Sequence, residues 1–163
     1  MCPKTLQLYF AIIGVIIIYY FVYRRIFHCA SVNFDTLATL VNSSQRVNSF
    51  SQATFAGIYK GRKVELQCPF FDKGRARIFS IEPLNAPPSK KMFMLQYPRP
   101  TRNTQLKGNK VFYSPEGFFN KGDSYYKIYS REELVQILEE LVEGAHNVEI
   151  GITDKSKDRC NDK

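Results

Sequence analysis

The chain has no tryptophan, and it contains only two histidines and four cysteines in 163 residues. The cysteines stand singly along the sequence, whereas zinc sites built from cysteine use closely spaced pairs. We therefore expect no metal site and no cofactor. All four, Cys2, Cys29, Cys68 and Cys160, are interpreted as reduced thiols, and a Cys29 to Cys68 bridge stays open.

No catalytic constellation is visible in the sequence either. His28 adjoins an apolar segment and His146 follows a predicted helix, so the pattern places neither beside a nucleophile. Cys68 falls on the apolar face of a predicted strand, and a reactive thiol needs a neighbour that lowers its pKa. We expect Cys68 in the core and name no catalytic residue. A membrane-tethered enzyme with a site assembled from distant residues stays open as an alternative function.

Charge is missing from a long apolar segment, Leu6 to Tyr23. A helix over this segment is about 27 Å long, close to the roughly 30 Å of a bilayer's hydrocarbon core. The bulky, basic residues that follow, Arg24 and Arg25 among them, do not suit signal-peptide cleavage, and Cys29 lacks the small residues that precede a lipoprotein cysteine. The segment therefore predicts a single transmembrane helix.

The flanking charges predict the orientation of this helix. Lys4 stands alone on the amino side, whereas Arg24 and Arg25 follow the helix directly. Because Lys and Arg near the helix ends favour the cytoplasmic side, we expect the carboxyl-terminal domain in the cytoplasm.

The remaining length suffices for one domain, and 44% hydrophobic and 14% aromatic residues are typical of a folded one. We expect a short tail at 1–5, the transmembrane helix at 6–23, and a basic collar, short helix and linker at 24–50. An α+β domain at 51–153 and a disordered tail at 154–163 complete the chain. In the linker, the spacing of Phe34 and Leu37 predicts a short helix from Asn33, a possible cap, to Asn42, and the polar residues 42–49 predict a loop.

A hairpin is predicted from Thr54 to Cys68, with a two-residue turn at Lys60-Gly61. This register pairs Tyr59 with Arg62, and it puts the apolar side chains of both strands on one face. Gly57 is predicted to lie where a neighbouring element leaves no room for a larger residue.

Further strands are predicted at Arg75–Ile81, Lys91–Tyr97, Lys110–Tyr113 and Tyr125–Tyr129. A capping box at Ser130–Glu133 then begins an amphipathic helix that Gly144 is expected to end, before a last strand at Val148–Ile152. The predicted fold class is α+β, an antiparallel sheet with one packed C-terminal amphipathic helix, preceded by a single N-terminal transmembrane helix.

The chain contains the hairpin sequence Gly-Ile-Tyr-Lys-Gly-Arg-Lys-Val from Gly57 to Val64, followed by Phe112, Phe118-Phe119 and the helix from Ser130 to Leu141. In these features it resembles a loosely defined group of uncharacterised membrane-anchored prokaryotic proteins. The resemblance covers Phe55 to Ile152 and departs from the group at Tyr113, where the pattern prefers aspartate. It implies a domain boundary ahead of the hairpin and no particular activity.

Acidic residues are absent between Pro83 and Pro115, although the net charge of the chain is +8. A basic face of this kind either keeps a protein soluble or contacts anionic lipid headgroups. A protein partner at a sheet edge is equally open, whereas we do not expect nucleic acid, because aromatic stacking platforms are not evident. A nucleic-acid-binding module therefore stays only an alternative to an interaction or scaffolding module. The predicted anionic-surface contacts are Lys90, Lys91, Arg99, Arg102, Lys107 and Lys110.

Overall fold

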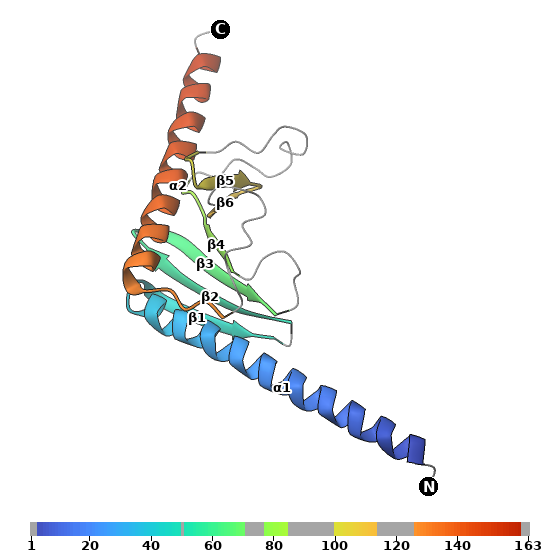
Figure 1. Cartoon of the computed structure of the whole chain (residues 1–163). Helices are drawn as coiled ribbons and strands as arrows, with labels where there is room; N and C mark the ends of the chain where they lie inside the picture. Colours follow the sequence, from blue (N-terminus) through green and yellow to red (C-terminus); the bar gives the residue numbers. More distant parts are fainter. Residues whose placement is uncertain (1–2, 50, 71–76, 85–99, 114–125, 161–163) are drawn as a thin grey trace.

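A computed structural model shows two long helices and one sheet (Figure 1). It describes residues 3–49, 51–70, 77–84, 100–113 and 126–160, with side chains from residue 7 to residue 150. Helix α1 (Pro3–Ala38) precedes the sheet, and helix α2 (Arg131–Cys160) follows it. Both helices lie in part against the sheet and in part beyond it (Figure 1).

The sheet has six antiparallel strands in the order β1-β2-β3-β4-β6-β5. This arrangement confirms the predicted α+β fold with a long apolar helix at the amino end and a packed helix at the carboxyl end. The strands are β1 (Asn42–Asn48), β2 (Gln52–Tyr59), β3 (Arg62–Pro69), β4 (Ile78–Ile81), β5 (Thr104–Lys107) and β6 (Lys110–Tyr113).

The hairpin of β2 and β3 has the predicted register, with Tyr59 opposite Arg62. Lys60 and Gly61 have φ angles of 47° and 76°, which is the left-handed pair that a tight two-residue turn needs. Gly57 is also confirmed as a close approach, because a Cβ atom there would lie 2.5 Å from Cγ2 of Val41. The turn chemistry and the alternation of side chains thus fix the centre of the sheet.

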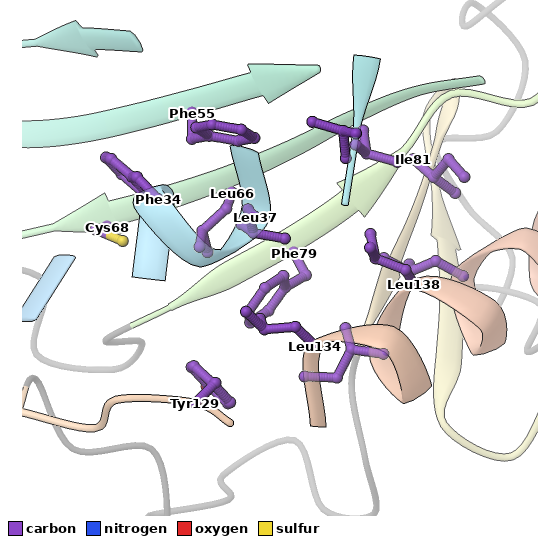
Figure 2. Close-up of a cluster of buried hydrophobic side chains, with 14 of the residues drawn as sticks. Phe34, Leu37, Phe55, Leu66, Cys68, Phe79, Ile81, Tyr129, Leu134 and Leu138 are labelled. Atoms are coloured by element: carbon purple, nitrogen blue, oxygen red, sulfur yellow. The ribbon is translucent and has the colours of Figure 1, made fainter. Parts of the chain in front are cut away.

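The hydrophobic core lies between one face of the sheet and the two helices (Figure 2). Strand residues such as Phe55 and Leu66 meet Phe34 of α1, while Leu138 of α2 covers the part of the sheet around Ile81 (Figure 2). The rings of Phe34 and Phe55 are 5.6 Å apart between centroids. Each helix therefore contributes a separate stripe to one shared core.

The predicted short helix at Asn33–Asn42 is wrong, because α1 continues without a break from the apolar segment to Ala38. Asn33 is no cap but a fully buried residue in the last third of α1. Its Nδ2 donates to the carbonyl of Lys127 at 3.0 Å, and its Oδ1 accepts from the amide of Tyr129 at 2.9 Å. A buried amide with both groups paired explains why the helix tolerates asparagine there.

One loop prediction and one strand prediction fail, at a polar and at an aromatic segment. Residues 42–48, predicted as a loop, form β1, whose side chains are all exposed. Residues 126–129, predicted as the end of a strand, belong to no strand, because the backbone there hydrogen-bonds Asn33 instead of a neighbouring strand. Strand β5 was not predicted, and the predicted strand at Lys91–Tyr97 lies outside the described residues.

Helix α2 begins as predicted, since the amide of Glu133 donates to Oγ of Ser130 at 3.1 Å and the amide of Ser130 donates to Oε2 of Glu133 at 2.8 Å. Its predicted end at Gly144 and the predicted strand at Val148–Ile152 are wrong, because the helix continues to Cys160 and so includes most of the expected tail. Gly144 instead serves packing. A Cβ atom there would lie 2.7 Å from Oγ1 of Thr104.

Candidate functional site

The amino-terminal part of α1 carries the largest exposed apolar surface in the described part of the chain. By length and composition, Gln7–Ala38 is the one helix there that could cross a membrane. Exposed aliphatic and aromatic side chains surround it on all sides, as a lipid-facing helix requires. They are Leu8, Tyr9, Phe10, Ile12, Ile13, Val15, Ile16, Ile17, Ile18, Tyr19, Tyr20, Phe21 and Val22.

The same helix joins the core within one turn of this surface. Tyr23 and Phe27 contact Phe70 at the end of β3, with ring centroids 5.2 and 6.4 Å from it. Ile26 and Ala30 are buried. Because no hinge separates the exposed apolar part from the packed part, the direction of α1 fixes the direction of the whole domain.

The contacts of α1 distinguish two ends of the sheet. The proximal end, where α1 leaves the domain, contains the β1–β2 connection and Phe70, whose amide donates to the carbonyl of Ser51 at 2.9 Å. The distal end contains the turn at Lys60-Gly61, together with Glu82, whose amide donates to the carbonyl of Lys63 at 2.9 Å. Strands β1 and β2 run alongside α1 between these ends (Figure 1).

At the proximal end, the face of α1 opposite the core is cationic. Arg24, Arg25 and His28 are exposed, and helical spacing puts them on one side, whereas Ile26 and Ala30 point into the domain. We call Arg24 and Arg25 the cationic face. It lies directly after the exposed apolar part of the helix, so it is at the height of the lipid headgroups when that part spans a bilayer.

Residues 126–129 lie beside the cationic face and are fixed to α1 at two points. The guanidinium carbon of Arg25 lies 5.2 Å from the centroid of the Tyr126 ring, within cation–π range. Further along α1, on the side away from the apolar part, Asn33 hydrogen-bonds the backbone of Lys127 and Tyr129. Tyr126 nevertheless keeps 42% of its surface exposed. An aromatic ring and an arginine are therefore held together at the proximal end.

The six predicted surface cations do not form one described cluster. Lys90, Lys91 and Arg99 lie outside the described residues, while Arg102 and Lys107 are exposed around β5. Lys110 is half-buried between two acids, with Nζ 2.5 Å from Oε2 of Glu65 and 3.4 Å from Oε1 of Glu82. Lys110 therefore joins β3, β4 and β6 at the distal end and is not presented to a ligand.

Electrostatics around Lys110 agree with this structural role. Burial alone would lower the pKa of Lys110, but the hydrogen bonds and charges of Glu65 and Glu82 outweigh it and raise that pKa. Burial likewise opposes ionisation of Glu65, whose pKa is nevertheless lowered by hydrogen bonds from Lys110 and Gln67. Both partners therefore stay charged at neutral pH.

Helix α2 is attached to the distal end by two further carboxylates. Glu149, 13% exposed, accepts from Nε of Arg62 at 3.1 Å, from its NH2 group at 2.7 Å and from the amide of Leu84 at 2.8 Å. Glu139 accepts from the hydroxyl of Tyr59 at 2.6 Å, and burial together with this bond raises the pKa of Tyr59 to about 12. Glu139 and Glu149 therefore hold α2 against the distal end of the sheet.

The side chains considered for catalysis take structural or solvent-facing positions. Cys68 is fully buried, as predicted, and burial raises the pKa of its thiol to about 11 although Arg77 acts in the opposite direction. Cys29 and Cys68 are separate free thiols. His146 is exposed on α2 and not in a loop. Within the described residues, no three His, Cys, Asp or Glu side chains gather as a metal site.

No family model, curated protein or solved structure matches this chain. The resemblance to membrane-anchored prokaryotic proteins therefore stays a prediction.

Proposed function

We propose that this chain is a single-pass membrane protein whose domain is an interaction module, held upright on the cytoplasmic side of the bilayer, and that β1 is its docking strand for a protein partner. The observation that carries the proposal is the continuity of α1, which passes from an exposed apolar helix into the core without interruption. Such a helix sets the height and direction of everything packed on it.

The open edge of β1 supports its role as a docking strand. The amide of Ser49 donates to the carbonyl of Gln52, so alternation directs the backbone groups of Val47 toward β2 and those of Arg46 and Asn48 toward the open edge. The pairing with β2 is irregular between Asn42 and Gln45, so the regular part of the edge is Gln45–Asn48. All seven side chains of β1 are exposed, and the strand contains neither the lysine nor the proline that commonly protects an edge. The opposite edge, β5, has only four residues.

The direction of β1 indicates the kind of partner. Strand β2 runs away from the proximal end, so β1 runs back toward it. An extended segment that leaves the same bilayer beside α1 would lie antiparallel to β1, which is a favourable arrangement for strand addition. A second copy related by a two-fold axis would need its anchor to point the opposite way, so we propose a different membrane protein as the partner.

The test is position-specific crosslinking with the full chain in its native membrane. A photoreactive residue at Gln45 or Val47 should form one discrete adduct, whereas the same residue at Gln105 on β5 should not. Asn48→Pro removes a backbone donor of the open edge without removing a bond to β2, so it should abolish the adduct while the domain melts as before. Equal adducts from β1 and β5, or an unchanged adduct in Asn48→Pro, would contradict the docking role.

A further inference from the structure

The geometry points to a binding site for the phosphate of an anionic lipid headgroup, formed by Arg24 and Arg25 of the cationic face and by Tyr126. This inference rests on the proposed membrane anchoring and adds a ligand class to it. It differs from the six-cation surface predicted from the sequence, because it places the lipid contact on α1 itself.

The first support is the position of the two arginines. They are the first charged residues after the exposed apolar part of α1, and both are exposed. The headgroup layer begins where the hydrocarbon core ends, so both guanidinium groups reach phosphate oxygens without leaving the surface of the domain. A guanidinium binds phosphate through two parallel hydrogen bonds, which gives arginine an advantage over lysine at such a position.

The second support is the charge around the site. The first acid after the arginines on α1 is Asp35, and its Oδ1 is 2.8 Å from the NH1 group of Arg46. Lys127 lies beside the site and its Nζ is 3.4 Å from Oε1 of Glu133, which also caps α2. Asp35 and Glu133 are therefore each engaged with another cation. Among the residues that the structure describes, neither Arg24 nor Arg25 forms a salt bridge, so their charge can meet an anionic ligand.

The third support is the orientation of Arg25 and Tyr126. The Tyr126 ring lies 5.2 Å from the guanidinium carbon of Arg25, and the hydrogen bonds of Asn33 hold the following residues against α1. An arginine that is already held at a ring loses less freedom when it binds phosphate. Tyrosine also prefers the headgroup layer, where its ring meets apolar chains and its hydroxyl meets water. The pair therefore suits a lipid surface better than either residue alone.

The test uses the full chain in nanodiscs and in detergent, with native mass spectrometry to count bound phosphatidylglycerol and phosphatidylcholine of identical acyl chains. The unsubstituted chain should retain phosphatidylglycerol in preference. Removing both charges in the variant Arg24→Gln/Arg25→Gln should lower this preference by about 25-fold, since a cation near an anionic surface contributes about fivefold. Arg102→Gln/Lys107→Gln is the matched control, because it removes two exposed cations around β5 and should leave the preference unchanged.

Three further variants separate binding from folding. Arg25→Lys keeps the charge but loses the paired hydrogen bonds, so it should retain only part of the preference, and Tyr126→Phe keeps the ring and should retain more than Tyr126→Leu. An equal loss in the control pair, or no loss in Arg24→Gln/Arg25→Gln, would overturn the headgroup site. A chain that enters nanodiscs but does not discriminate between the lipids overturns this inference alone. Release of the full chain from membranes by alkaline carbonate would overturn the proposed anchoring as well.

Discussion

Helices α1 and α2 are arranged alike, but the part of each that projects beyond the sheet differs in polarity. Each packs one part on the sheet and extends the other beyond it (Figure 1). The projecting part of α1 is apolar from Gln7 to Val22 with exposed side chains, whereas the last turns of α2 carry Asp154, Lys155, Lys157, Asp158 and Arg159. The packed parts decide the fold, whereas the projecting parts differ in sequence, apolar in α1 and charged in α2.

The largest expected effect comes from cutting α1 on either side of the point where it joins the core. Removing residues 1–22 should leave a soluble, folded domain, because it deletes only the projecting part. Removing residues 1–38 should abolish folding, since Phe34 and Leu37 are among the buried residues that meet β2 and β3. Circular dichroism and thermal melting of the two fragments measure the difference. A shorter fragment that melts cooperatively would show that α1 is dispensable to the core.

The glycines of the two helices sharpen the comparison. Gly144→Ala should destabilise the domain by about 1–3 kcal/mol, because its Cβ would lie 2.7 Å from Oγ1 of Thr104 and 3.1 Å from Cγ1 of Val111. Gly14→Ala is the control in the projecting part of α1, where nothing lies within 4 Å of the new Cβ atom. Urea denaturation gives the free energy of unfolding for each variant of the full chain in detergent. Equal destabilisation by both substitutions would contradict the difference in packing.

The smallest effect is expected from acid at the distal attachment of α2. Burial opposes ionisation of Glu149, but hydrogen bonds from Arg62 and the Leu84 amide outweigh it and hold its pKa below the ordinary value of 4.5. A carboxyl whose folded-state pKa is lowered stabilises the fold above its unfolded pKa, and this contribution is lost as the pH falls through the folded-state value.

Glu149→Gln should therefore cost on the order of 1 kcal/mol at pH 7 and lose part of the acid sensitivity below about pH 4.5. Chemical denaturation at several pH values between neutral and acid measures both the loss of stability at pH 7 and the dependence of stability on pH. Glu143→Gln, on the same helix but without a described pair, is the control and should change neither. A Glu149→Gln variant with the full acid slope of the unsubstituted domain would refute the assignment.

The parts of the fold that sequence could predict are those encoded by neighbouring residues. The turn at Lys60-Gly61 needs two residues with positive φ, and the capping box needs only Ser130 and Glu133. The apolar segment of α1 is equally local, because hydropathy along about twenty residues suffices. In each case the determining interaction lies within one element or between adjacent strands.

The parts that could not be predicted depend on contacts between distant segments. Strand β1 has few residues that favour strands and buries none of them, so only its pairing with β2 creates it. Gly144 is a common helix terminator, and only Thr104 and Val111 show that it is a packing residue instead. Lys110 was predicted as an anionic-surface contact, and sequence could not show its partners, Glu65 and Glu82, because they reach it only when β3, β4 and β6 are neighbours.

The two hydrogen bonds of Asn33 also bear on the order of folding during synthesis. Asn33 leaves the ribosome long before its partners, which are 94 and 96 residues further along the chain. The apolar helix can form early, but Asn33 lacks these two partners until most of the domain has been translated. Contacts of such large sequence separation form late and slowly. The domain therefore completes its core only after residues 127–129 have emerged.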